Sequence, residues 1–153
     1  MPALTLSVDQ KFSPEEKRAI ATAISAAVHR GLELAKVPKN PRRVLLTFQY
    51  IDPEDVAIDG TLVSEGAMFP YKLEYNGLAL TDEQKVVVTN ELTRAIVEAL
   101  GLPQDEGGYS SVSVLYVPYG PTDYAIGGRF FQAWDRQYGA RILELITRKR
   151  ERF

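Results

Sequence analysis

The sequence of this chain repeats itself, and this repeat constrains the fold more than any other feature. When residues 70–130 are laid over residues 2–62 with a constant offset of 68, Pro70 falls on Pro2. Other matches fall at helix caps, strand starts and glycine turns, where the backbone geometry restricts the residue type. The pattern indicates a tandem duplication, so the chain should contain two similar structural units.

The first copy is expected to form a strand, a helix and a second strand. Residues 3–8 alternate apolar and polar side chains, as a half-buried strand does. Ser13, Pro14 and Glu16 mark a helix start, because Ser-x-x-Glu is a capping box and proline suits the first helical position. Residues 43–50 predict the second strand, which is more continuously apolar. A helix of this kind can connect two parallel strands.

The second copy repeats this order. Thr81 and Gln84 form another capping box, between a strand that contains Leu73 and Tyr75 and a later strand over residues 112–117. We therefore predict an α+β fold. Its duplicated β-α-β units should form a four-stranded mixed sheet with two helices on one face.

Three further segments complete the expected organisation. Residues 56–68 and 124–131 contain glycines and aromatic residues, which are typical of short hairpins or loops. Residues 132–153 are predicted to add a C-terminal helix, and its basic end favours a solvated helix terminus over a nucleic-acid or membrane contact. The chain of 153 residues suits a single domain with one core.

The composition argues against several classes of function. A net charge of -2 gives no overall field that would attract nucleic acid or an acidic membrane. With no cysteine and one histidine, the chain lacks the usual residues for a metal site or a Ser-His-Asp triad, so we expect no metal and no cofactor. Neither a signal peptide nor a membrane span is evident, and a cytoplasmic location is expected.

Pro2 directly follows Met1, and this position makes it a candidate catalytic base. Methionine aminopeptidase normally removes Met1 before a proline, which would leave Pro2 with a free secondary amine. The pKa of a model α-amino group is about 7.7 to 8, and burial or nearby guanidinium groups lower it. The neutral amine would then be available near neutral pH. The alternative is that Pro2 only stiffens the start of a strand.

In their duplicated β-α-β context, these residues resemble the tautomerase superfamily, whose members use an amino-terminal proline as catalytic base or acid. Residues 81–85, Thr-Asp-Glu-Gln-Lys, are similar to the family's Ser-Asp-Glu-Gln-Lys helix start. Residues 43–47 resemble the Arg-Val-Ile-Ile-Thr strand of 4-oxalocrotonate tautomerase (4-OT), and residues 125–128 resemble its Gly-Ile-Gly-Gly hairpin. The resemblance covers residues 2–131. Longer members with two fused units assemble as trimers, so a homotrimer is implied.

The resemblance also implies roles for individual residues. Pro2 would shuttle the proton, and Arg43 would hold a substrate carboxylate with its planar guanidinium group. Only the first copy has both groups, because Ser111 matches Arg43 and the internal Pro70 has no free amine. The candidate substrate-binding residues are Lys11, His29, Tyr116, Tyr124 and Arg129.

Lys11, His29 and Arg129 are included for different reasons. Lys11 precedes Phe12, which stands where the short tautomerases have a second arginine. His29 matches a helix histidine of the cis-3-chloroacrylic acid dehalogenases when counted from the proline, and differs by one residue when counted from the helix cap. The alternative is an ordinary surface or core histidine. Arg129 either faces the site or forms a salt bridge at its rim.

Tyr116 and Tyr124 are candidates for the walls of a pocket that would keep Pro2 dry. In the family, the corresponding strand end and hairpin approach the proline. The alternative for both tyrosines is packing in the core or at the trimer interface.

The resemblance leaves three functions open. The first choice is a cofactor-independent keto-enol tautomerase acting on a small 2-oxo or 2-hydroxy-enoic acid. The second is hydration, dehalogenation or decarboxylation of a small unsaturated or oxo acid, although Ile126 stands where the dehalogenases carry a water-activating glutamate. The third is a non-catalytic trimer, which is favoured by Phe12, Leu80 and Ser111 at positions of family arginines.

Overall fold

The computed structural model describes residues 2–38, 43–77, 79–119, 125–126 and 129–130. The chain divides into two compact units between Pro118 and Tyr119. Each unit is considered by itself below.

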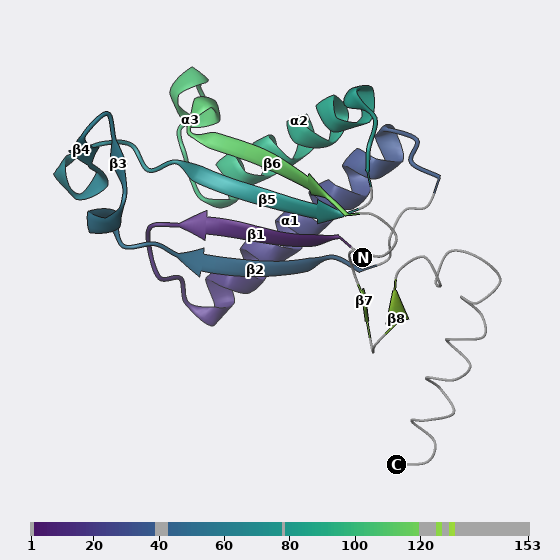
Figure 1. The fold of residues 1–153 in the computed structure, drawn as a ribbon. Coiled ribbons are helices and arrows are strands. Elements are labelled where there is room, and N and C mark those ends of the chain that lie inside the picture. The colour runs from purple at the N-terminus through teal and green to yellow at the C-terminus, as the bar shows by residue number, and fades with distance from the viewer. Residues whose placement is uncertain (1, 39–42, 78, 120–124, 127–128, 131–153) are drawn as a thin grey trace, which may run out of the picture. The chain divides into compact units, whose positions relative to one another are not determined.

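The first unit contains a four-stranded sheet in the order β2-β1-β5-β6 (Figure 1). The central strand β1 (Ala3–Val8) pairs in parallel with β2 (Leu45–Tyr50) and antiparallel with β5 (Tyr71–Gly77). The edge strand β6 (Val112–Pro118) pairs in parallel with β5. This mixed sheet confirms the α+β class that the sequence predicts.

Two long helices cover one face of the sheet (Figure 1). They are α1 (Pro14–Leu34), which connects β1 to β2, and α2 (Asp82–Ala99), which follows β5. Both predicted helix starts are confirmed. The Ser13 side chain accepts a backbone N–H of the first turn of α1, and Thr81 and Gln84 form a complete capping box on α2.

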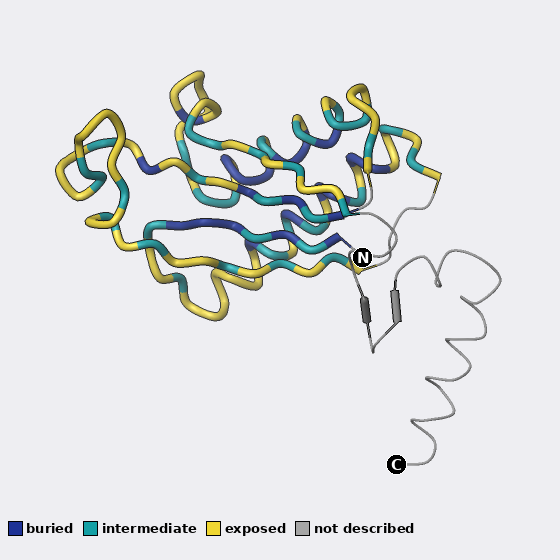
Figure 2. The backbone as a smooth tube through the Cα atoms, viewed as in Figure 1, coloured by how far each residue is buried: buried dark blue, intermediate teal, exposed yellow. Residues whose placement is uncertain are grey.

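The core lies between these helices and the two central strands. Figure 2 shows the buried stretches running along β1 and β5 and along the helix sides that face the sheet. The most completely buried large side chains are Leu4, Leu6, Val8, Ile24, Val28, Leu32, Leu73, Val88, Leu92, Ile96 and Val97. Burial of these apolar groups is the main stabilising contribution to the first unit.

The shorter elements include both predicted hairpins. One hairpin consists of β3 (Ala57–Ile58) and β4 (Thr61–Leu62), and the other, in the second unit, consists of β7 (Ala125–Ile126) and β8 (Arg129–Phe130). The remaining short elements are η1 (Pro53–Asp55), η2 (Val63–Glu65) and α3 (Glu106–Ser110). The predicted C-terminal helix over residues 132–153 lies outside the described residues. Of the helices that the structure describes, none has the length and apolarity needed to cross a bilayer.

The strand pairing places the two copies in a slightly different alignment from the one with a constant offset. Leu4 pairs with Leu46 in the first copy, and Leu73 pairs with Val114 in the second. The helices and the second strands keep the offset of 68, whereas the first strands differ by 69. An offset of 68 would match the buried Leu4 with the exposed Lys72, which points to the other face of the sheet.

This one-residue difference changes the partner of the amino-terminal proline. The residue of the second copy that occupies the place of Pro2 is Tyr71, not Pro70. The gap-free alignment is therefore wrong in its first strand. The second copy has one residue fewer between its first strand and its helix.

Candidate active site

Strands β1 and β2 begin where β5 and β6 end (Figure 1), and Pro2 directly precedes β1 at this end of the sheet. Pro2 is buried, and its carbonyl oxygen accepts a hydrogen bond of 3.0 Å from the backbone N–H of Leu45. Ala3 pairs with Asn76, so Pro2 lies beside the end of β5. Arg43 is exposed and precedes β2 by two residues. The structure thus brings the predicted base and the predicted arginine to the same end of the sheet.

A small hollow of about 10 Å³, the space of about one water molecule, lies at this end, between the ends of β5 and β6 and the start of α2. Its lining residues are Tyr75, Gly77, Ala79, Leu80, Lys85, Tyr116 and Pro118. A Cβ atom at Gly77 would lie 2.9 Å from the Tyr75 ring, so a larger residue there would make the ring shift. The walls are mainly apolar and aromatic, with a single cationic side chain.

Tyr116 contributes its ring to the hollow and its hydroxyl to helix α2. The hydroxyl lies 2.9 Å from Thr89 Oγ1 and 3.3 Å from the Lys85 carbonyl oxygen, to which it donates. The rings of Tyr75 and Tyr116 are in contact, with centroids 5.2 Å apart. Burial raises the pKa of Tyr116, although its hydrogen bond with Thr89 acts in the opposite direction. Tyr116 therefore lines the hollow as a neutral phenol, and its role towards a substrate stays a prediction.

Lys11 is at the opposite end of β1 from Pro2. Its ammonium group lies 5.2 Å from the ring centroid of Tyr50, the last residue of β2. The six residues of β1 separate the two ends by about 20 Å. Within one chain, Lys11 and Pro2 therefore cannot bind the same small substrate. Lys11 could only join the Pro2 site from another copy of the chain.

The other predicted site residues are placed only in part. His29 is partly exposed on α1, five residues before the end of that helix. Arg129 belongs to β8, of which only the backbone is described, and Tyr124 lies outside the described residues. Their roles in substrate binding remain predictions.

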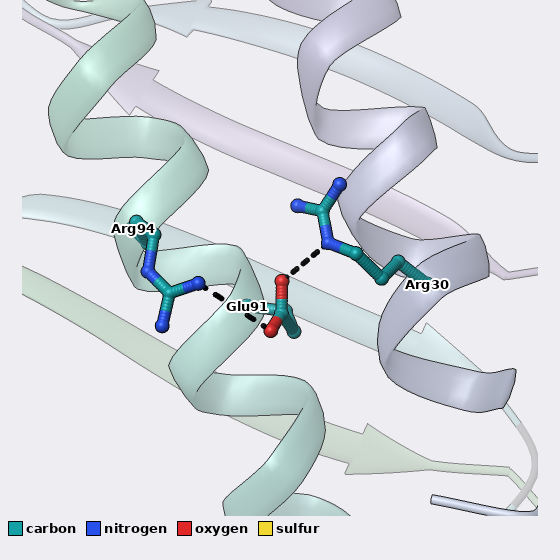
Figure 3. Close-up of polar contacts among 3 residues, drawn as sticks. All are labelled: Arg30, Glu91 and Arg94. Carbon is teal, nitrogen blue, oxygen red and sulfur yellow. Dashed lines mark hydrogen bonds and ion pairs between the residues drawn. The ribbon is translucent and has the colours of Figure 1, made fainter. Parts of the chain in front are cut away.

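The only buried carboxylate among the described residues belongs to Glu91, and it is held by two arginines (Figure 3). Glu91 is 8% exposed and accepts a hydrogen bond of 2.5 Å from Arg30 Nε, which joins α2 to α1. Arg94 lies 3.6 Å from its other oxygen. Both oxygens are occupied, so this carboxylate holds the helices together and is not a candidate general base.

The end of the sheet where β5 begins is closed at the place that corresponds to Pro2. The Tyr71 hydroxyl donates a 3.2 Å hydrogen bond to Asp9 Oδ1, and the Phe69 ring packs edge-on at 4.9 Å. Burial raises the pKa of Tyr71 to about 12, with smaller contributions from the Asp9 charge and hydrogen bond. A neutral phenol with so high a pKa offers no base near neutral pH.

Of the lining residues, only Tyr116 was predicted from the sequence to be part of the site, and Lys85 is the charged residue among those that were not. Lys85 belongs to the capping motif of α2, where the sequence gives it only a place in a helix start. Its position in the hollow depends on the end of β6, far away in the sequence. Among the described residues, no cluster of histidines and carboxylates could hold a metal ion.

Comparisons with known proteins agree at the level of the fold. No protein-family model and no curated protein matches the sequence. The crystal structure of a native fused 4-OT superimposes with a TM-score of 0.73 at 18% identity, over 88% of this chain and 99% of that chain. A fused 4-OT that forms a symmetric trimer gives a TM-score of 0.69 at 23% identity with the same coverage.

Malonate semialdehyde decarboxylase, described with decarboxylase and hydratase activities, gives a TM-score of 0.60 at 16% identity, over 82% of this chain and 90% of that chain. All three structures are of tautomerase-superfamily enzymes. The chain therefore has the tautomerase-superfamily fold, which confirms the resemblance found in its motifs.

Proposed function

We propose that this protein is a cofactor-independent keto-enol tautomerase that acts on a small 2-oxo or 2-hydroxy-enoic acid. The observation that carries the proposal is the position of Pro2, buried at the head of β1 beside a largely apolar hollow and near Arg43. Removal of Met1 would convert the Pro2 nitrogen from an amide into a secondary amine. The fold shared with fused 4-OT supports an enzyme of this superfamily.

The mechanism uses one proton carrier. The neutral Pro2 amine takes the hydroxyl proton of the enol, and the resulting ammonium group returns a proton to a carbon of the conjugated system, which leaves the ketone. Arg43 binds the carboxylate and draws electron density away from the reacting carbons. Pro2 is buried, and burial favours the neutral form of an amine over the charged form.

We also propose that the protein assembles as a homotrimer. The helix-free face of the sheet exposes Leu45 by 47%, Leu115 by 48% and Val117 by 38%. A trimeric fused 4-OT of the same fold supports this state. Analytical ultracentrifugation should give three times the chain mass of 17.1 kDa. A monomer at micromolar concentration would contradict the trimer.

The first test is the intact mass of the protein expressed without a tag. A mass short by one methionine establishes the free amine of Pro2. Retention of Met1 would remove the base and favour a non-catalytic role for the fold. The mass of each variant is measured in the same way, so that a change in processing is not mistaken for a change in chemistry.

The second test is the rate of ketone formation from 2-hydroxymuconate and phenylenolpyruvate. Pro2→Ala should lower kcat/KM by about 10²- to 10⁴-fold, the usual contribution of a positioned proton carrier. Pro70→Ala is the matched control, because its nitrogen lies inside the chain, and it should keep the wild-type rate. Equal rates for wild type and Pro2→Ala would exclude the mechanism. Release of CO₂ from a 3-oxo acid would instead favour decarboxylation, the activity of malonate semialdehyde decarboxylase.

A further inference from the structure

We infer that Lys17 and Lys85 keep the two outer edges of the sheet from pairing with strands of a second copy of the chain. Strands β2 and β6 lie at these edges, and no described strand pairs with their outer sides. An unpaired edge offers a row of backbone N–H and C=O groups to any other strand. Neither lysine needs a free Pro2 amine for this role.

Both edge strands have free backbone groups on their outer sides. The N–H groups of Leu45 and Ile51 bond to β1, so the alternate residues between them, such as Phe48, direct their backbone groups away from β1. In the second copy, the Ser111 carbonyl accepts a hydrogen bond from β5, so Tyr116 directs its backbone groups away from β5. A strand from another copy could form a ladder of hydrogen bonds with either edge.

The composition of the two edge strands favours such pairing. Residues 44–51 and 112–117 contain no charged residue, no proline and no glycine. Both segments are rich in aromatic, β-branched and leucine side chains, which is typical of segments that form intermolecular sheets. Each pairs with its inner neighbour without a bulge. Any charge beside these edges is therefore supplied by other elements of the fold.

A lysine from the start of a helix lies beside each edge strand. The ammonium group of Lys17 lies 6.0 Å from the ring centroid of Phe48 in β2, and that of Lys85 lies 5.7 Å from the ring centroid of Tyr116 in β6. The helix dipole disfavours a cation near the start of a helix. Stabilisation of the helices therefore explains neither charge, whereas lysine beside an edge strand is a known protection against edge pairing.

The stem and the charge of these lysines have separable effects. The methylene stem can cover an aromatic ring without any charge. Repulsion of a second copy needs the charge, because two β2 edges that pair would each bring a Lys17 to the same junction, and like charges across a strand pair are destabilising. The same holds for Lys85 between two β6 edges. Replacing the charge while keeping the stem therefore tests the inference.

The test measures association beyond the native assembly, by sedimentation velocity over a range of protein concentrations. Lys17→Met and Lys85→Met keep the stem over the ring and remove the charge. The association constant of each should rise about two- to fivefold. Lys17→Arg and Lys85→Arg should match the wild type. The control is Lys36→Met, which removes an exposed charge beyond the end of α1 and should also match the wild type.

The net charge of the chain cannot account for such a rise. Loss of one lysine changes the net charge from -2 to -3, which strengthens the overall repulsion between copies. Salt screens charges, so association of the wild type should rise with the concentration of sodium chloride, and that of the methionine variants should rise less. Urea denaturation of each variant first establishes that it folds as the wild type does.

Hydrogen exchange measured by mass spectrometry identifies the surface through which the copies associate. Residues 44–51 should gain protection in associated Lys17→Met, and residues 112–118 should gain it in associated Lys85→Met. Protection of each variant at its own edge supports the inference. If the methionine variants associate no more than the wild type, or associate through another surface, the lysines do not guard the edges.

Discussion

The two ends of the sheet lie at equivalent positions of two similar β-α-β units, yet they have opposite characters. At one end, Pro2 lies beside a small hollow lined by Tyr116 and by Lys85, whose ammonium group lies 5.7 Å from the Tyr116 ring centroid. At the other end, Tyr71 takes the place of Pro2 and is closed in by Phe69 and a hydrogen bond to Asp9. The two similar units therefore place different residues at equivalent positions, and only the end beside Pro2 has a hollow next to it among the described residues.

The comparison separates contacts that hold the unit together from contacts that determine the chemistry. Both copies keep a capped helix start and a lysine over an aromatic ring of the following strand. They differ in the residues at the strand ends, where Pro2 in the first copy corresponds to Tyr71 in the second.

The largest expected effect tests whether the two copies contribute equally to stability. Ile24 and Leu92 occupy matching positions on the two helices, and both are completely buried. Ile24→Ala and Leu92→Ala should each lower the free energy of unfolding by about 2 to 5 kcal/mol, because each leaves a cavity in the same core. Urea denaturation measures both, with Val86→Ala, which is 60% exposed, as the surface control. A cost below about 1 kcal/mol at either site would mean that this copy is loosely packed.

A smaller effect concerns the contact that breaks the symmetry between the copies. Glu91 joins the helices through Arg30, whereas Ala23 stands at the matching position of the first helix. Glu91→Gln should lower the free energy of unfolding by about 1 to 3 kcal/mol, since it removes a charge-assisted hydrogen bond from a buried position. Glu98→Gln, on the exposed side of α2, should cost less than about 0.5 kcal/mol. If Glu91→Gln and Glu98→Gln lower the free energy of unfolding equally, the ion pair between Glu91 and Arg30 does not stabilise the contact between the helices.

Most of the framework follows from local patterns in the sequence. Ser13 and Thr81 mark both helix starts correctly, because a side-chain cap acts within one turn of the chain. Alternation of apolar residues also identifies the central strand. The alignment with a constant offset fails by one residue because it matches Pro2 with Pro70, whereas the core requires Leu4 to match the inward-facing Leu73. Burial, not residue identity, determines the register of a strand.

Other features depend on contacts that a sequence pattern does not contain. The short helix α3 holds Gly107 and Gly108, which argue against a helix locally, yet a Cβ atom at Gly108 would overlap the Pro103 carbonyl group. Lys85 joins the hollow only because β6 pairs beside β5. Pro2 and Arg43, in contrast, are brought together by the parallel pairing that the β-α-β pattern predicts.

The smallest expected effect tests whether the Tyr71 end is truly closed. Its folded pKa is about 12 and its ordinary value is 10.0, so the unfolded chain loses this proton first as the pH rises. The stabilising contribution is complete below pH 10 and is lost as the pH rises from 10 towards 12. Tyr71→Phe should cost about 1 kcal/mol below pH 10, through the lost hydrogen bond to Asp9, and should show a weaker decline in stability above it.

Urea denaturation of wild type, Tyr71→Phe and Tyr109→Phe between pH 8 and pH 11 measures this difference. Tyr109 is 38% exposed on α3, so its substitution should leave the decline unchanged. If Tyr71→Phe declines as steeply as the wild type, the phenol is open to water and the end of the sheet beside it could still admit a ligand. The two ends of the sheet would then differ only in the base. The Pro2 end would have an amine, and the accessible Tyr71 end would have none.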